Sequence, residues 1–216
     1  FTITSTVGNV FGNAKTLFGP AGDYSTLTGG EYGGLGWGFY YVGTNTSIAR
    51  GGKWNDAYGA GVFTANANTT QSTSVGYRCS YHPLREPTPT PTNIPSPTPT
   101  PAYGCPGEYV LVSAIPPYTT SNFCVAVYES KQILDSNSLP LPAASSQAAG
   151  SPWPISSRDM AQAACQANGT NYDLISNAEW QTVARTIEAD DSNWSGGLVG
   201  SGAINRGSNR SQNHRS

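Results

Sequence analysis

A stretch of alternating proline and threonine at residues 83–101 constrains this chain more than any other feature. It reads PLREPTPTPTNIPSPTPTP and holds eight of the sixteen prolines. Alternating proline and threonine offers no apolar side chain to bury and no free amide at every second position. We therefore expect an extended polyproline II linker that rises about 3.1 Å per residue. It divides the chain into residues 1–82 and residues 102–216.

The linker also offers hydroxyl groups for glycosylation, because Thr-Pro repeats are common O-glycan acceptors. Two interpretations stay open, a bare spacer between domains and a glycosylated stalk that sets a distance from a surface. The candidate acceptors are Thr88, Thr90, Thr92, Thr98 and Thr100.

Composition excludes several classes of protein. Only 11% of the residues are charged and the formal net charge is -2, so a basic face for nucleic acid is not expected. The aromatic content of 11% is unlike that of a disordered chain. No apolar run approaches the roughly 20 residues that span a bilayer. We expect neither a nucleic-acid partner nor a membrane span in this segment.

The cysteines indicate the compartment. There are four, Cys79, Cys105, Cys124 and Cys165, and no C-x-x-C motif. An even count with low charge fits an oxidising compartment, so an extracellular or cell-surface location is predicted. The chain starts at Phe1 and ends in a polar stretch without helix or strand signals. We expect that an export segment has been removed or that this is a piece of a longer protein.

Local patterns predict strands on both sides of the linker. Before it, strands are predicted at 47–50, 60–66 and 75–80, within a glycine-rich background. After it, strands are predicted at 109–112 and 123–128. A disulfide between Cys105 and Cys124 would close the loop that joins these two and contribute about 3 kcal/mol.

Two helices are predicted near the end of the chain. The first covers 158–167 with Ser156 or Ser157 as its N-cap, because Met160, Ala163, Ala164 and Ala167 fall on one face. Gly169 is placed to end it. The second begins at Ser176 with a capping box in which Glu179 is the partner. Its apolar face is Trp180, Val183, Ala184 and Ile187.

Four blocks of this sequence resemble the formylglycine-generating enzyme (sulfatase-modifying factor) family. The blocks WPISSRDMAQAAC at 153–165 and YDLISNAEW at 172–180 are similar to segments that begin the family's domain. The blocks ARGGKWN at 49–55 and VGYRC at 75–79 are similar to segments that end it. Here the closing segments come first, so the chain resembles two partial modules joined by the Pro-Thr linker.

The resemblance implies an α+β, C-type-lectin-like fold of the non-catalytic bacterial type. It also implies that the cysteine of the first helix, Cys165, pairs with the closing cysteine, Cys79, which would leave Cys105 for Cys124. Two explanations of the order stay open, tandem half modules and one permuted module. We favour tandem halves, each completed by another copy of the chain, as in subunits that grow into fibres.

The family's chemistry is not expected here, so we predict that the chain is not an enzyme and has no cofactor. The positions that match the family's two copper-binding cysteines are Asp56 and Gly61, which lack a thiolate. His82 and His214 are expected to be solvated. Residues 190–193 (DDSN) offer oxygens for Ca²⁺, but too few for a full coordination shell, so no metal site is predicted.

The remaining candidates for recognition are aromatic residues in glycine- or proline-rich loops. Trp37, Tyr58 and Trp194 are predicted to face a ligand, by stacking on sugars or on partner side chains. The first hypothesis is a structural or adhesive surface protein, assembled as a filament from copies of itself. The second is a module that binds glycans or surface proteins, and the third and least favoured is an oxidase-type enzyme.

Overall fold

The computed structural model describes residues 2–6, 37–41, 47–50, 62–63, 65–68, 76–83, 104–154 and 157–204. These residues form an α+β structure, in agreement with the predicted class, whose strands pair mostly in antiparallel fashion. The strands before the linker are β1 (Thr2–Thr6), β2 (Trp37–Tyr41), β3 (Ser47–Arg50), β4 (Ala65–Asn68) and β5 (Cys79–Tyr81). After it come β6 (Tyr109–Val112), β7 (Phe123–Ala126), β8 (Ser130–Leu134), β9 (Pro140–Ser146), α3 (Arg158–Gln166), β10 (Tyr172–Leu174), α4 (Asn177–Glu188) and the 3-10 turn η3 (Asp191–Asn193).

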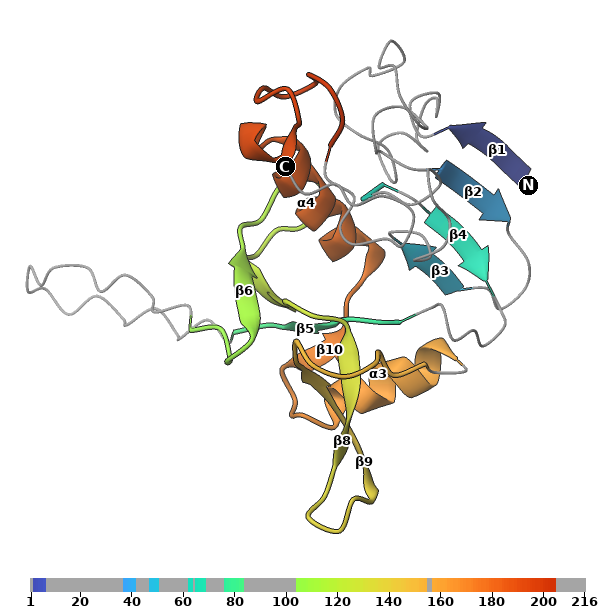
Figure 1. Cartoon of the computed structure of the whole chain (residues 1–216), viewed down its shortest axis with the longest axis vertical. Helices are drawn as coiled ribbons and strands as arrows, with labels where there is room; N and C mark the ends of the chain where they lie inside the picture. Colours follow the sequence, from blue (N-terminus) through green and yellow to red (C-terminus); the bar gives the residue numbers. More distant parts are fainter. Residues whose placement is uncertain are drawn as a thin grey trace, which may run out of the picture.

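The central sheet joins the two sides of the linker. Its strand order is β10-β5-β7-β6, and every neighbouring pair is antiparallel. Only β5 comes from before the linker, and it lies between two strands that come after it (Figure 1). The register places Leu174 opposite Cys79 and Val125 opposite Ser80. An inner strand of this sheet is therefore supplied by the part of the chain that precedes the linker.

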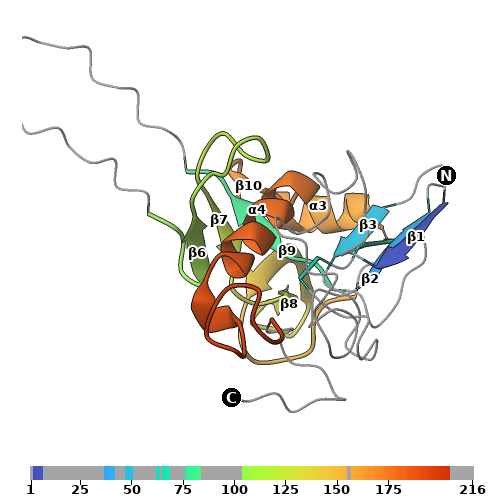
Figure 2. The ribbon, with the colours of Figure 1, turned by 90° about the horizontal axis from the view of Figure 1, so that it is seen from above.

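Two further sheets flank this arrangement. The strands β1 to β4 form a sheet of order β1-β2-β4-β3, in which β2 and β4 are parallel. They lie together at one side of the molecule in both views (Figures 1 and 2). The strands β8 and β9 form a two-stranded hairpin that projects away from the central sheet in Figure 1, with an irregular register between Gln132 and Leu134.

Both predicted helices are present with the predicted caps. Ser157 caps α3 by accepting a hydrogen bond from the backbone N–H of Met160. Ser176 caps α4 and forms the capping box with Glu179, whose carboxylate accepts from the Ser176 backbone N–H at 2.7 Å. Such caps satisfy amide groups that have no partner within the helix.

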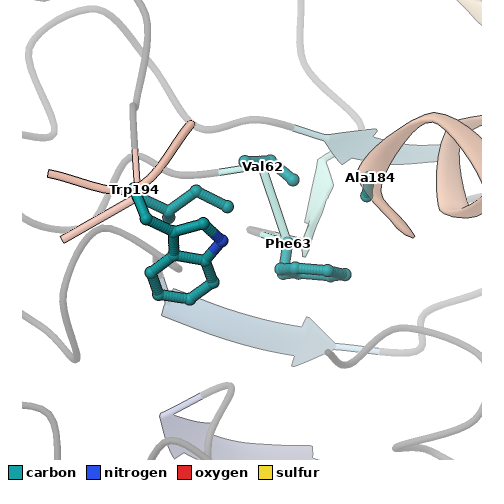
Figure 3. Close-up of a cluster of buried hydrophobic side chains, with 5 residues drawn as sticks. Val62, Phe63, Ala184 and Trp194 are labelled. Atoms are coloured by element: carbon teal, nitrogen blue, oxygen red, sulfur yellow. The ribbon is translucent and has the colours of Figure 1, made fainter. Parts of the chain in front are cut away.

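The largest hydrophobic cluster is also shared between the two sides of the linker. Val62 and Phe63, from before it, pack with Ala184, Trp194 and Ile204 from after it (Figure 3). Nearby, the Trp180 indole N–H donates to the Val62 carbonyl at 2.9 Å. Phe63 is fully buried, so the helix α4 depends on residues that precede the linker for part of its apolar contact.

Both disulfides form the pairs that the family resemblance implies. Cys79 bonds to Cys165 with their Cα atoms 5.5 Å apart, and Cys105 bonds to Cys124 with a Cα separation of 5.8 Å. Both separations are ordinary for a disulfide. They point to a non-reducing environment. No helix in the described ranges has the length and apolar character to cross a membrane.

Some predicted strands have different bounds in the structure. The strand predicted at 60–66 appears as β4 at Ala65–Asn68, and the one at 75–80 as the shorter β5 at Cys79–Tyr81. The latter is shorter because the carbonyls of Tyr77 and Arg78 accept hydrogen bonds from the Ser130 and Ile175 amides, outside the pairing of β5 with β7 and β10. The linker predicted at 83–101 lies, apart from Pro83, outside the described residues.

We predict that Phe63→Ala lowers the free energy of unfolding by about 3–5 kcal/mol, because it opens a cavity against α4. Urea denaturation followed by tryptophan fluorescence measures the loss. Leu139→Ala is the matched control, since Leu139 is 60% exposed and its truncation should change stability by less than about 0.5 kcal/mol. Equal stability of the two variants would contradict the shared core.

Candidate functional site

An open groove lies beside the ends of β5 and β10. Its volume is about 710 Å³, within the usual range for small-molecule sites. One of its residues precedes the linker, one is the first residue of the linker, and the others belong to the end of α3, the turn into β10 and β10 itself. The lining residues are His82, Pro83, Gln166, Ala167, Gly169, Thr170, Asn171, Tyr172 and Asp173.

An aromatic residue, Tyr172, lines the groove, and its ring packs against two further tyrosines. Tyr172 lies opposite Tyr81 across the strand pair, with ring centroids 4.9 Å apart, and meets the Tyr109 ring edge-on at 5.8 Å. Burial, followed by the neighbouring Tyr172, raises the pKa of Tyr109 to about 12. Burial and then Tyr81 raise the pKa of Tyr172. These phenols are therefore held neutral, and the cluster offers aromatic faces and hydroxyl groups without charge.

The turn before Tyr172 leaves its ring uncovered on one side. Gly169 adopts a φ of +138°, which favours glycine. A Cβ atom at this position would lie 3.6 Å from the Tyr172 ring. The absence of a side chain therefore keeps this approach to the ring clear.

A histidine and a buried carboxylate meet at the wall of the groove. His82 Nε2 lies 3.2 Å from Glu179 Oε1; the His82 side chain is 52% exposed and that of Glu179 is 8% exposed. The Ser80 hydroxyl lies 3.5 Å from Glu179 Oε2 and 3.5 Å from His82 Nε2. The strand β5 and the first turn of α4 position this cluster.

This cluster does not have the arrangement of a serine hydrolase triad. In a triad the serine and the acid bond to different nitrogens of the imidazole. Here Ser80 and Glu179 both approach His82 Nε2. Ser80 is also completely buried, so its hydroxyl does not reach a substrate. The carboxylate of Glu179 is engaged in the capping box, as predicted, and the contact anchors His82 to α4.

Two further polar residues of α4, Gln181 and Arg185, connect this helix to other elements. The Arg50 guanidinium donates a hydrogen bond to Gln181 Oε1 at 3.0 Å. Burial lowers the pKa of Arg50 to about 9. Arg185 bonds to Glu188 at 3.3 Å and to the Tyr118 hydroxyl at 3.0 Å. Its cation also lies 5.9 Å from the Phe63 ring centre. These groups link α4 to β3 and to the loop before β7, a structural role.

One predicted ligand-facing residue is placed in the core instead. Trp194 is only 3% exposed, packs against Phe63, and donates its indole N–H to the Glu188 carbonyl at 2.8 Å. The prediction is wrong here because the glycine-rich loop around Trp194 folds back through its pairing with Ile204. Trp37 belongs to β2, and Tyr58 lies outside the described residues.

The acidic run at the end of α4 serves the local turn. Asp190 accepts from the backbone and side chain of Ser192, which lowers its pKa, and Asp191 accepts from the Val199 amide at 2.7 Å. Within the described residues no group of three or more potential metal ligands gathers. The linker threonines, Asp56, Gly61 and His214 lie outside the described residues.

The sequence reasoning missed the tyrosine cluster. Tyr81 lies two residues after Cys79, and Tyr172 lies seven residues after Cys165. The Cys79–Cys165 disulfide brings these two segments together. The disulfide pairing that the family resemblance implies could therefore have predicted that the two tyrosines lie close to each other. Comparison with family models, with curated proteins and with solved structures gives no match.

We predict that stability falls as the pH rises from 10 to 12. Tyrosines in the unfolded chain lose their protons near pH 10, whereas Tyr109 in the folded chain holds its proton to about 12, and the pKa of Tyr77 is also raised, chiefly by burial. The unfolded state therefore binds fewer protons in this range, and stability declines with pH. Urea denaturation across the range measures the decline. Tyr109→Phe should reduce the slope, and an unchanged slope would contradict the assignment.

Proposed function

We propose that this chain is a non-catalytic extracellular module with a structural or adhesive role. We further propose a C-type-lectin-like fold of the formylglycine-generating-enzyme type for it. The two disulfide pairs are consistent with that fold, since the family resemblance implies them.

The observation that carries the proposal is the place of β5 in the central sheet. Its strand partners, β7 and β10, both follow the linker. The residues on either side of β5 also bond to partners that follow the linker. The Tyr77 carbonyl accepts a hydrogen bond from the Ser130 amide, and the His82 amide donates one to the Asn171 carbonyl. The Cys79–Cys165 disulfide adds a covalent bond. One part of the chain thus completes the other, which is strand complementation within a single chain and favours the permuted order.

The same contacts are open to exchange between copies of the chain. The end of β5 and the start of β6 are separated only by β7 in the sheet, a gap of about 10 Å at ordinary strand spacing. The 20 residues from 84 to 103 would span roughly 60 Å in the polyproline II conformation expected from the sequence. This length is several times what closure within one chain requires. It permits the segment before the linker to complete a second copy, which is domain swapping.

A catalytic role has less support. The positions matching the family's two copper-binding cysteines, Asp56 and Gly61, carry no thiol. The one serine–histidine–glutamate cluster in the described part of the chain has a buried hydroxyl and the wrong pattern of contacts for acyl transfer. A binding module is the second candidate, and the groove beside Tyr172 is the observation that favours it.

Exchange is tested by mixing two variants that are each unable to form the long-range disulfide. Of the two cysteines in this disulfide, the Cys79→Ser chain keeps only Cys165, and the Cys165→Ser chain keeps only Cys79. After mild unfolding and refolding together in a glutathione buffer, we expect a covalent heterodimer on a non-reducing gel. Mass spectrometry of the tryptic peptides should identify a Cys79–Cys165 bond between chains.

The matched control is the pair Cys105→Ser and Cys124→Ser. Both cysteines follow the linker, so exchange of the preceding segment leaves their bond within one chain. We expect no heterodimer from this pair. If the first pair gives no more covalent heterodimer than the second, assembly by exchange is wrong and the chain is a closed single unit.

A further inference from the structure

We propose that the groove beside Tyr172 binds a neutral carbohydrate. The proposal develops the binding-module candidate, and it does not depend on exchange between copies. It involves residues other than Trp37, Tyr58 and Trp194.

The aromatic part of the groove is Tyr172. Its ring is held by contacts with Tyr81 and Tyr109 at centroid distances of 4.9 and 5.8 Å. Gly169 leaves one approach to the ring open. Small-molecule sites combine such an apolar surface with a few placed polar groups. The C–H face of a pyranose ring stacks on an aromatic ring in the same way as other apolar groups do.

The polar part of the groove offers neutral donors and acceptors. Gln166 and Asn171 contribute amides, and Thr170 contributes a hydroxyl; Gln166 and Thr170 are exposed. An amide both donates and accepts hydrogen bonds, which suits the hydroxyl groups of a sugar. Asp173 is held in place because its Oδ1 atom accepts from the Leu174 amide at 2.7 Å and from Gln166 at 3.4 Å.

The charges of the lining determine the class of carbohydrate. Among the described residues, the lining contains one carboxylate, Asp173, and no lysine or arginine. The buried Glu179 adds a second carboxylate behind His82. A phosphate or a uronic acid would meet like charge, and no described residue of the lining offers it a guanidinium or ammonium group. A neutral sugar avoids this cost.

The groove exists only when both sides of the linker are assembled. His82 and Pro83 form one wall, and residues 166–173 form the rest. The His82 amide donates to the Asn171 carbonyl at 2.9 Å and fixes the two walls relative to each other. Sugar binding is thus a property of the completed sheet, whichever copy of the chain supplies β5.

The test is a titration of the isotope-labelled whole chain with cellotriose, followed by amide chemical shifts. We expect saturable shifts confined to His82 and to residues 166–173. Tyr172→Leu keeps apolar volume but removes the aromatic face, and it should weaken binding about tenfold. Gln166→Ala removes an exposed amide without touching the core, and it should weaken binding about threefold.

Two controls make the outcome decisive. Asp159 lies at the other end of α3 and its side chain is 90% exposed. The Asp159→Ala variant should therefore bind like the unmodified chain. Trigalacturonate, the acidic counterpart of the probe, should cause no saturable shift. The proposed site is wrong if cellotriose causes no saturable shifts, or if the shifts are centred elsewhere. It is also wrong if Gln166→Ala and Tyr172→Leu both bind cellotriose like the unmodified chain. Equal binding of trigalacturonate would overturn the neutral preference.

Discussion

The structure depends on the insertion of β5 between β7 and β10. The inner strand of an antiparallel sheet uses its backbone groups on both sides, and here both partners come from the far side of the linker. Cys79 then bonds from this strand to Cys165 on α3, which ties the sheet to the helix that packs beside it. Without β5, the strands β7 and β10 would each expose an unpaired edge. The cluster around Phe63 is shared in the same way, because Val62 and Phe63 also come from before the linker.

The helix α4 is organised as much by polar groups as by apolar ones. Glu179, Gln181, Thr182 and Glu188 are buried on it, and burial of such groups is costly unless they are paired. Three of them have partners on other elements or at the cap: Ser176 and His82 for Glu179, Arg50 for Gln181, and Thr119 for Thr182. Glu188 pairs with Arg185 on the same helix. These directional bonds fix the rotation of the helix. The same rotation sets His82 at the groove wall.

The sequence predicted the elements whose signals are local. The capping box at Ser176 and Glu179 requires only neighbouring residues, so α4 was predicted at its correct start. The strand at Tyr109–Val112 carries a run of apolar residues and was also predicted. The hairpin of β8 and β9 was not, because PLPAASS contains no strand alternation and gains its order from pairing with β8. Trp194 was misplaced for the same reason, since its burial follows from distant Phe63 and Ile204.

The linker begins at the proposed groove, so the segment proposed to allow exchange between copies and the proposed binding site are neighbours. The described chain leaves β5 through His82 and Pro83, which are also groove residues, and it returns at Gly104 just before the disulfide of Cys105 with β7. The Pro-Thr segment therefore begins next to the groove. A long, apolar-poor connection at this place costs little in closure entropy, since that cost grows only slowly with length. The fold can thus accommodate a long connection beside the proposed groove, while the two disulfides hold the surrounding strands together.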